Sequence, residues 1–338
     1  MTRWLDNSST DNVVVSTRIR VARNLKNRVF PIYSTEADAL SIKDSIKKAI
    51  EELFPQGEYS YHQLIELESR EKMRYMEDHL ISPGLVDHSR KSGFFLRNDE
   101  KVTIMINEED HIRLQTLLPG LDLVEGWRLC SEIDDILESK LDFAWHEEYG
   151  YLTSCPTNTG TGLRASVMLH LPGVSMTGHI SNIIDALRKI GLTIRGIYGE
   201  GTEAVGHLYQ VSNQLTLGES EDEIIEKLNR VVNQLIRREK NTREFLKDKK
   251  HLELEDKVFR SLGLLRSARL ISSKEAMEMI SYIKLGKDLG MVEYQQWQDL
   301  IKLMIEIKPG NIQNRLGKTM NRVERDQVRA EMVRDYFK

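Results

Sequence analysis

The sequence is poor in cysteine and has no long apolar run. Cys130 and Cys155 are the only cysteines among 338 residues, too few for a disulfide framework and at a spacing that matches no zinc site. Both are therefore expected to be reduced thiols. No run of 18 or more apolar residues occurs, and the first residues, MTRWLDNSSTDN, lack the charged-then-apolar pattern of a secretion signal. We expect a cytoplasmic protein without a membrane partner.

Familiar nucleotide-binding signatures are also missing. No GxxxxGK[ST] loop occurs, so a Walker-type phosphate cradle is not expected. Gly199-Glu200-Gly201 resembles the start of a protein-kinase glycine loop, but Ala204 stands where the third glycine should be, and no HRD or DFG motif is found. A formal net charge of −4 argues against direct nucleic-acid binding. Any phosphate binding must therefore depend on side chains, above all on arginine.

The chain does contain an alternation of strand-like and helix-like patterns. An apolar content of 40% is enough for an ordinary buried core. Residues 12–23 alternate as a strand, with Arg18 and Arg20 together on its polar face. Helices are predicted over 35–54, 69–80, 123–141 and 180–190, strands over 93–96, 102–106 and 207–212, and a turn at 82–84. This mixture predicts an α+β fold with helices packed on a sheet.

The character of the chain changes after Ser220. Residues 221–250 have the pattern of one long charged helix, and almost no strand alternation follows. Further helical spacing occurs over 254–265, 273–285, 292–305 and 322–337, with a break predicted at 309–311. We therefore expect one domain over residues 1–247 and a small helical domain over residues 248–338, whose apolar faces could also support self-association.

Arginines recur in four loops or strand ends that are distant in the sequence. They are Arg18, Arg20, Arg113, Arg164 and Arg195. A guanidinium group presents a planar fork of donors that matches phosphate oxygens, so five arginines in one cleft would suit a nucleoside triphosphate. Taken singly, each could instead be a solvated charge or part of a structural ion pair. No carboxylate cluster resembles a metal cage, so Mg²⁺ would be held by the nucleotide and water, and no residue is assigned as a metal ligand.

Four motifs together resemble the phosphagen (guanidino) kinases. They are Ser16-Thr17-Arg18-Ile19-Arg20, Asn107-Glu108-Glu109-Asp110-His111-Ile112-Arg113, Cys155-Pro156-Thr157-Asn158 to Arg164-Ala165-Ser166, and Arg195-Gly196 to Glu200. Their order and spacing match that family over roughly residues 11–235. Within it, the sequence is most similar to the bacterial protein arginine kinases of the McsB type, which also have a helical C-terminal domain. The resemblance implies a catalytic domain built on an antiparallel sheet flanked by helices.

The resemblance also implies a site for ATP. The five arginines would bind the phosphates, and the neighbouring backbone would line the nucleotide. The implied nucleotide-binding residues are Ser16, Thr17, Arg18, Ile19, Arg20, His79, Arg113, Arg164, Ala165, Ser166, Val167, Met168, Arg195, Gly196, Ile197, Tyr198 and Gly199. The motif around His79 is short, so this histidine could also lie at the end of a surface helix without a ligand.

The resemblance assigns the acceptor side to Glu109, Glu200 and Cys155. Two carboxylates can grip two edges of a guanidinium group and hold its attacking nitrogen in line with the γ-phosphate. A guanidinium has a pKa above about 12, so a positioned carboxylate base must remove a proton before it attacks. Adjacent residues of extended backbone point to opposite sides, so only one of Glu108 and Glu109 should face the acceptor. The resemblance selects Glu109.

Two departures from the metabolic members of the family bear on the substrate. Members that act on creatine have an apolar residue at the position of Glu200, so glutamate favours arginine as the acceptor. STRIR begins at position 16, without the helical domain that closes over a free small substrate, so an open acceptor side and an arginine on a protein are expected. A kinase of free arginine remains an alternative. Cys155 would lie beside the guanidinium as a reactive thiol, or simply be buried.

The C-terminal domain contains an RDxxRA motif formed by Arg325, Asp326, Arg329 and Ala330. In McsB-type proteins this motif forms an allosteric phosphoarginine pocket. Arg325 and Arg329 are four residues apart on a helix and could clamp a phosphoryl group, although an exposed charged helix would have the same pattern. A catalytically silent phosphoarginine-binding adaptor is therefore a second alternative. Implied partners are a zinc-binding activator protein, a heat-shock transcription repressor and an AAA+ unfoldase in protein quality control and stress response.

Overall fold

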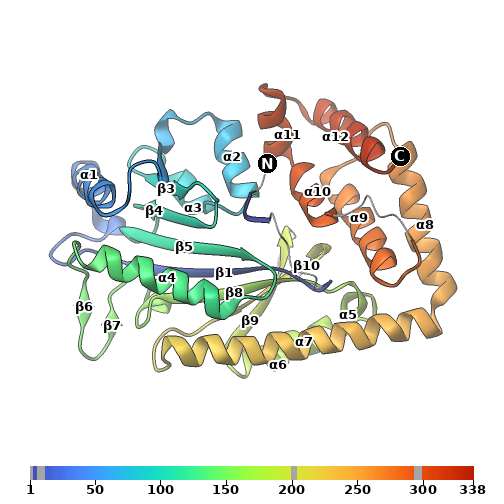
Figure 1. Cartoon of the computed structure of the whole chain (residues 1–338), viewed down its shortest axis with the longest axis horizontal. Coiled ribbons are helices and arrows are strands. Elements are labelled where there is room, and N and C mark those ends of the chain that lie inside the picture. Colours follow the sequence, from blue (N-terminus) through green and yellow to red (C-terminus); the bar gives the residue numbers. More distant parts are fainter. Residues whose placement is uncertain (1–2, 6–11, 199–203, 293–298) are drawn as a thin grey trace.

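A computed structural model describes residues 3–5, 12–198, 204–292 and 299–338. Its centre is an antiparallel sheet of eight strands in the order β2-β3-β4-β5-β1-β8-β10-β9. Figure 1 shows β5 and β1 side by side in the middle of the molecule. The strands are β1 (Val14–Arg23), β2 (Tyr59–Gln63), β3 (Gly93–Arg97), β4 (Val102–Ile106), β5 (Ile112–Pro119), β8 (Leu163–His170), β9 (Leu192–Tyr198) and β10 (Ala204–Asn213). A separate hairpin pairs β6 (Trp145–His146) with β7 (Gly150–Tyr151). The predicted α+β class with an antiparallel sheet is confirmed.

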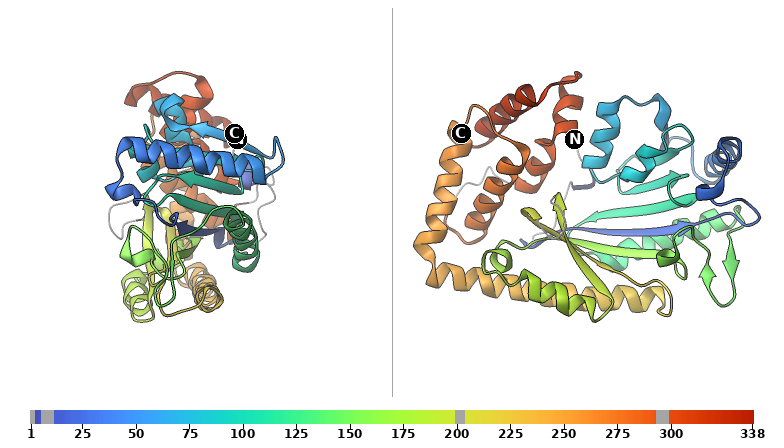
Figure 2. Two further views of the ribbon diagram at one scale, coloured as in Figure 1. Left: turned by 90° about the vertical axis from the view of Figure 1, so that its left-hand side faces the viewer. Right: turned by 180° about the vertical axis from the view of Figure 1, so that it is seen from behind.

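Helices cover one face of this sheet. The covering helices are α1 (Glu36–Leu53), α4 (Leu123–Glu138), α6 (Ile180–Arg188) and α7 (Glu221–Lys249). The right-hand view of Figure 2 shows the longest of them, α7, running below the strands. Their apolar stripes pack against side chains such as Ile19 and Val167, which are fully buried. Because side chains alternate along a strand, the next residues, Arg18, Arg20 and Ser166, must point to the opposite face. Burial of one face thus places the arginines on the other.

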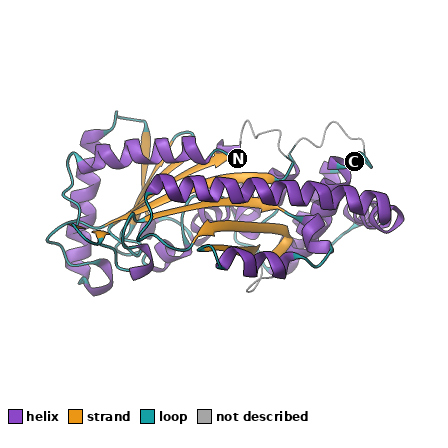
Figure 3. Cartoon of the chain, turned by 90° about the horizontal axis from the view of Figure 1, so that it is seen from below, coloured by secondary structure: helices purple, strands orange, loops and turns teal. Residues whose placement is uncertain are grey.

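The C-terminal helices pack against the far end of the same sheet. They are α8 (His251–Ser267), α9 (Ser273–Asp288), α10 (Leu300–Glu306), α11 (Pro309–Leu316) and α12 (Arg322–Tyr336). Their core includes Val15, Met168, Val205 and Leu208 of the sheet, so the bundle shares apolar contacts with the strands. The long helix α7 connects the two parts, as Figure 3 shows from below. The predicted boundary at residue 247 falls in the last turn of α7, which ends at Lys249.

A smaller third core lies beneath the remaining short helices. Two short helices cover this core, α2 (Ser69–Glu77) and α3 (Pro83–Asp87). A further short helix, α5 (Pro172–Met176), does not cover it and packs against α7 instead. Trp4, Leu64, Leu80 and Phe94 fill this core together with Ile305 of α10. The C-terminal helices therefore contact the N-terminal part of the sheet as well as its far end.

Two predicted breaks are helix starts instead. Residues 82–84 were expected as a turn, but α3 begins at Pro83, and the Ser82 hydroxyl accepts a hydrogen bond from Leu85 N. Residues 309–311 were expected as a break, but α11 begins at Pro309. Proline is tolerated in the first turn of a helix because its missing N–H would have no partner there.

No helix of the described residues is long and apolar enough to span a bilayer.

Strand β5 was not predicted because it has almost no alternation. It lies between β4 and β1 in the sheet, and Leu114, Gln115, Thr116, Leu117 and Leu118 are all buried. A strand that is buried on both faces has a continuous run of apolar residues in place of the alternating apolar and polar pattern that predicts a strand. Its start, however, is the predicted Ile112-Arg113, so the strand carries one of the five arginines into the middle of the sheet.

Candidate active site

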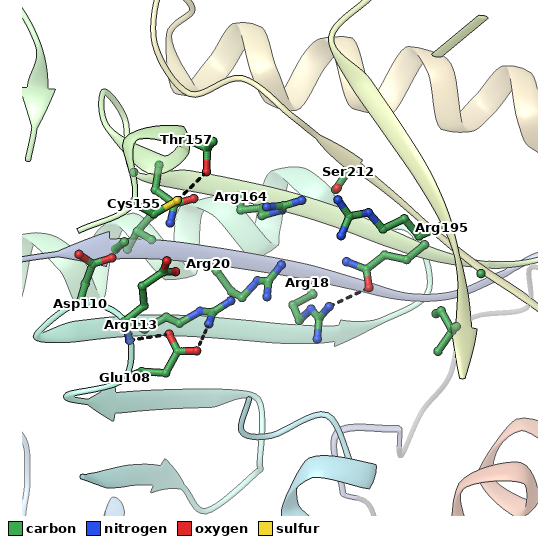
Figure 4. A pocket seen from close by; sticks show the side chains of 18 residues that line it. Arg18, Arg20, Glu108, Asp110, Arg113, Cys155, Thr157, Arg164, Arg195 and Ser212 are labelled. Atoms are coloured by element: carbon green, nitrogen blue, oxygen red, sulfur yellow. Dashed lines mark hydrogen bonds and ion pairs between the residues drawn. The ribbon is translucent and has the colours of Figure 1, made fainter. Parts of the chain in front are cut away.

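Strand register brings the five arginines to one face of the sheet. Arg20 on β1 lies opposite Arg164 on β8, and Arg113 on β5 lies opposite Ala22. Arg195 on β9 lies opposite Gln210, whose Oε1 accepts a hydrogen bond of 2.8 Å from Arg18 Nη2. All five line one cavity, and Figure 4 shows their side chains gathered on one face of the strands. The volume of the cavity is about 530 Å³. The structure thus brings together the arginines that the sequence places far apart.

The electrostatics of this cavity favour a bound anion. Burial, followed by the nearby charges of Arg18, Arg113 and Arg164, holds the pKa of Arg20 well below its usual value. Burial and the charges of Arg195 and Arg113 also lower the pKa of Arg164. Such shifts mean that the positive charges repel one another where water cannot screen them. The buried Nε of Arg20 has no hydrogen-bond partner among the described residues. A bound phosphate would offset the repulsion among the arginines and would accept a hydrogen bond from Arg20 Nε.

Glu108 is the ionic partner of Arg113. Its carboxylate accepts hydrogen bonds from Arg113 Nη1 at 2.5 Å and Ser82 Oγ at 2.7 Å. Burial opposes ionisation, but Arg113 and Ser82 outweigh it and the pKa of Glu108 is lowered. The carboxylate also accepts from the backbone N–H of Glu109 at 3.1 Å. Glu108 therefore orients Arg113 and the loop that carries Glu109, a role that the sequence did not reveal.

Glu109 lines the same cavity and is exposed, whereas Glu108 is buried. Removal from water, followed by the charges of Asp110 and Glu108, raises its pKa, while a hydrogen bond with Cys155 acts in the opposite direction. A carboxylate with a raised pKa is a better proton acceptor at neutral pH than an unperturbed one. The second predicted carboxylate, Glu200, lies outside the described residues.

Buried hydrogen bonds hold the acceptor-side loops together. Asp110 Oδ1 accepts from Asn24 Nδ2 and from Ser154 N, each at 2.6 Å. This ties the loop of Glu109 to the loop of Cys155, whose Sγ lies 3.0 Å from Thr157 Oγ1. Gly162 is required in the next turn, since it has a φ of +67° and a Cβ there would lie 2.7 Å from the carbonyl oxygen of Ala22.

Several predicted nucleotide contacts point away from the cavity. The side chains of Thr17, Ile19, Ala165 and Val167 are buried on the helix-covered face, because they alternate with the arginine-face residues. Thr17 Oγ1 instead donates to the carbonyl oxygen of Gly120. These four could therefore contact a nucleotide only through their backbone, and their assignment to the nucleotide site stays a prediction.

The other predicted nucleotide contacts lie at or beside the cavity. Gly196 and Ile197 line it directly, whereas Ser16, His79, Ser166 and Met168 line a small adjoining hollow that shares Arg18 and Gln210. Tyr198 ends β9, and Gly199 lies outside the described residues.

His79 is held in an uncommon backbone conformation next to Arg18. Its φ is +63°, and its carbonyl oxygen accepts from Gln115 Nε2 at 2.9 Å. Burial, then the charges of Lys308 and Arg18, holds the pKa of the imidazole well below its usual value. A neutral imidazole beside the arginines can contact a nucleotide without adding charge, and the surface-helix alternative is therefore not supported.

The RDxxRA motif lies on α12, and its two arginines have different surroundings. The guanidinium of Arg329 is buried and donates to the carbonyl oxygens of Ile307 at 2.7 Å and Ile271 at 2.9 Å, and to Asp326 Oδ1 at 2.5 Å. Ala330 is also buried. Arg325 is only half-buried, and its Nη1 donates to the carbonyl oxygen of Met320 at 2.8 Å. Arg329 is thus already paired within the bundle, whereas Arg325 is the more accessible of the two arginines, and the clamp stays a prediction.

Sequence reasoning missed part of the lining of the main cavity. Gln210 and Ser212 line it without having been predicted, and Glu108 lines it although the resemblance selected Glu109. Thr157 and Asn158 also line it and belong to a predicted motif, but they were given no role of their own. Gln210 and Ser212 alternate on β10, so a search for polar residues at every second strand position could have found them. Among the described residues, no group of three or more His, Cys, Asp or Glu side chains could hold a metal ion.

Comparison with known proteins agrees with this geometry. Residues 41–242 match the family model described as "ATP:guanido phosphotransferase, C-terminal catalytic domain", and residues 251–338 match "Protein-arginine kinase McsB C-terminal domain". A protein-arginine kinase of Brevibacillus brevis is 44% identical over 98% of this chain and 94% of its own length. That of Halothermothrix orenii is 44% identical over 99% and 96%, respectively.

Solved structures of guanidino kinases share the fold. A lombricine kinase aligns with a TM-score of 0.60 and 27% identity over 69% of this chain and 68% of its own. The duplicated taurocyamine kinase of Schistosoma mansoni, solved with bound transition-state analogue components, aligns with a TM-score of 0.59 and 27% identity over 69% of this chain and 33% of its own.

Proposed function

The chain belongs to the protein-arginine kinases of the ATP:guanido phosphotransferase family, and on that premise we propose which of its residues carry out the transfer. The reaction moves the γ-phosphoryl group of ATP to an arginine side chain of a protein. The observation that supports our assignment is the cavity that joins five arginines to Glu109. It offers an anion site and a carboxylate base on neighbouring walls.

We assign the phosphates of ATP to the arginine cluster. Arg18, Arg20, Arg113, Arg164 and Arg195 would neutralise the triphosphate and the charge that shifts from the γ-phosphoryl group to ADP during transfer. Arg20 would supply its unpartnered Nε to a phosphate oxygen. Mg²⁺ would add charge neutralisation when bound, but the described residues form no cage for it, so nucleotide oxygens and water would be its ligands.

We assign the acceptor guanidinium to Glu109, Glu200 and Cys155. Glu109 would accept a hydrogen bond from the guanidinium and take its proton as the attacking nitrogen approaches the γ-phosphorus in line with the leaving ADP. Cys155 lies beside Glu109 and would support the acceptor without becoming covalently linked to the phosphoryl group. Each transfer then forms one phosphorus–nitrogen bond and breaks one phosphorus–oxygen bond.

A direct experiment separates this assignment from its alternatives. Purified protein with MgATP should place acid-labile phosphate on arginines of a protein substrate, and Glu109→Gln should slow the labelling by roughly 10²–10⁴ while ATP still binds. Faster turnover of free arginine than of a protein substrate would support the free-arginine alternative. ATP-dependent labelling that persists at full rate in Glu109→Gln would refute the role of Glu109.

We further propose that α12 binds phosphoarginine and regulates the kinase, with Arg325 as the phosphoryl contact. A route to the active site exists: Arg329 holds the carbonyl of Ile307, and the next residue, Lys308, donates to the carbonyl oxygen of Glu77 at 3.1 Å. Glu77 lies two residues before His79, beside the arginine cavity. A change at α12 would therefore reach the nucleotide side through the Arg329 and Lys308 side chains and the backbone carbonyl groups that they bind.

The two arginines of the motif should give different phenotypes. Free phosphoarginine should raise activity, and Arg325→Ala should remove this response while the protein stays folded. Arg329→Ala should instead lower the unfolding temperature, because it removes the donor to the carbonyl groups of Ile307 and Ile271 and the closer of the two cationic partners of Asp326. An unchanged response to phosphoarginine in Arg325→Ala would refute the regulatory site.

The cellular setting is also a proposal. By likeness, a cytoplasmic role in stress response would bring a zinc-binding activator protein, a heat-shock transcription repressor and an AAA+ unfoldase as partners. Co-purification from cells, followed by phosphopeptide analysis under non-acidic conditions, tests these partners. Absence of all three from the purified complexes would contradict the proposal.

A further inference from the structure

A second cavity opens directly beside the catalytic carboxylate. It has a volume of about 460 Å³ and shares Glu108 and Glu109 with the arginine cavity. Its other walls are Pro31, Ile32, Gly84, His88, Lys91 and Ser154, and we call it the flanking cavity. None of these six lines the arginine cavity. The flanking cavity therefore lies on the acceptor side, next to the place assigned to the guanidinium.

One wall of the flanking cavity is an exposed apolar loop. Ile32 is 68% exposed, and its neighbours Tyr33 and Val29 are 80% and 49% exposed. Single exposed apolar side chains are ordinary, but three within five residues at the edge of a catalytic cavity form a patch that the fold itself leaves uncovered. This patch is continuous with the proposed acceptor site, so a molecule held at Glu109 would reach it.

His111 fastens this loop to the catalytic loop. Leu25 N donates to His111 Nδ1 at 3.0 Å, so Nε2 carries the proton and donates to the carbonyl oxygen of Val29 at 3.0 Å. The ring of Phe30 also meets the imidazole edge-on, with centroids 6.1 Å apart. Since Glu109 lies two residues before His111, the apolar wall and the catalytic carboxylate are held at a set distance from one another.

The opposite walls supply polar groups. Ser154 Oγ is buried and makes no well-aligned hydrogen bond among the described residues, although it lies close enough to Asp110 to lower the pKa of that carboxyl group. His88 and Lys91, which follow α3, add donors. A buried hydroxyl without a well-aligned partner can bond with a peptide N–H or carbonyl group of a bound chain. The cavity thus combines an apolar platform with donors and acceptors suited to a polypeptide backbone.

We propose that the flanking cavity binds the residues of the protein substrate next to the acceptor arginine. An apolar side chain adjacent to that arginine would pack on Pro31 and Ile32, and the adjoining peptide group would bond with Ser154 Oγ. This inference rests on the proposed function, since it requires the guanidinium to lie at Glu109. It makes Ile32 a residue that sets substrate preference without taking part in the transfer.

Two peptide substrates test the subsite with the full-length protein. One carries leucine on both sides of a single arginine, and the other carries glycine at those positions. Burial of a leucine side chain should give the first peptide a kcat/KM roughly tenfold higher, mainly through KM. Ile32→Ala should reduce this preference to less than about threefold and leave the glycine peptide unchanged.

Ile65→Ala is the matched control. Ile65 is also an exposed isoleucine, at 51%, but it lines neither cavity, so the preference should persist in this variant. Equal turnover of the two peptides by the wild type, or an undiminished preference in Ile32→Ala, overturns the subsite alone. Phosphorylation of free arginine but of neither peptide overturns the proposed protein acceptor and the subsite together.

Discussion

Replacement of Arg20 by methionine should raise the free energy of unfolding of the ligand-free protein and weaken its binding of ATP. The Arg20 guanidinium is surrounded by Arg18, Arg113 and Arg164, and burial and these charges together lower its pKa. In the absence of a phosphate, the positive group is therefore unfavourable where it stands. Methionine keeps most of the length of the side chain and removes the charge.

The loss in binding follows from the Nε that lacks a partner. A hydrogen bond to a charged group contributes about 1.5–3 kcal/mol. At about 1.4 kcal/mol for each factor of ten, Arg20→Met should weaken ATP binding by roughly 10- to 150-fold. The gain in stability comes from replacing a buried charge by an apolar group, which commonly adds about 1 kcal/mol or more. Each kcal/mol should raise Tm by roughly 2–4 °C.

Thermal unfolding with and without MgATP measures both effects. At a nucleotide concentration 100 times the wild-type Kd, the wild type gains about 2.7 kcal/mol, whereas a variant with thirtyfold weaker binding gains only about 0.9 kcal/mol. Arg20→Met should therefore have the higher Tm without nucleotide and the lower Tm with it. Calorimetric titration gives the two Kd values independently.

Arg237→Met is the control, because Arg237 is exposed on α7, away from the cavity. It should change neither Kd nor the order of the two Tm values. If Arg20→Met lowers Tm in the absence of nucleotide, the charge of Arg20 does not destabilise the ligand-free protein. If the variant binds ATP as tightly as the wild type, Arg20 does not bind the phosphates. Either result refutes the reasoning.

Three further predictions concern the base, the acid limit and the domain contact. Glu109→Gln should lower kcat by roughly 10²–10⁴ and leave the Kd of ATP within about threefold. In the wild type, the pKa of Glu109 is raised, so activity should be lost on the acid side at a pH above the usual pKa of glutamate. Burial lowers the pKa of His111 to about 4, so the unfolded state binds the extra proton between pH 6.5 and 4, and stability should fall by about 3 kcal/mol as pH drops through that range. Denaturant titrations in which His111→Gln keeps the full acid slope would contradict this. Gly310→Ala should destabilise the protein by about 1–3 kcal/mol, because a Cβ would lie 2.8 Å from Arg74 N. Gly263→Ala, with open space around it on α8, should be neutral or stabilising in the same unfolding assay.

Local patterns in the sequence were enough for much of the fold and for the chemistry of the site. The alternation of residues 12–23 correctly placed Arg18 and Arg20 on one face, since a period of two is a property of the strand itself. The long helix after Ser220 was visible for a similar reason, because Ser220 forms a capping box with Glu223 at its start. The motifs also identified the reaction, because a guanidinium acceptor and a triphosphate donor require particular side chains.

Strand order and packing decided what these patterns left open. β5, β1, β8, β10 and β9 lie side by side, and only this order places Arg113, Arg164 and Arg195 around Arg20. Pairing between distant strands depends on the whole core and is not written in any one segment.

Tertiary structure also separated residues that look equivalent in the sequence. Glu108 and Glu109 are adjacent carboxylates, but Arg113 and Ser82 engage the first and leave the second to the acceptor. Arg325 and Arg329 share a motif, but burial commits Arg329 to carbonyl oxygens. The sequence by itself determined which chemical groups are present and which face of a strand they occupy. Only the tertiary structure decided which of them are already paired, because a partner is set by contacts between segments far apart in the chain.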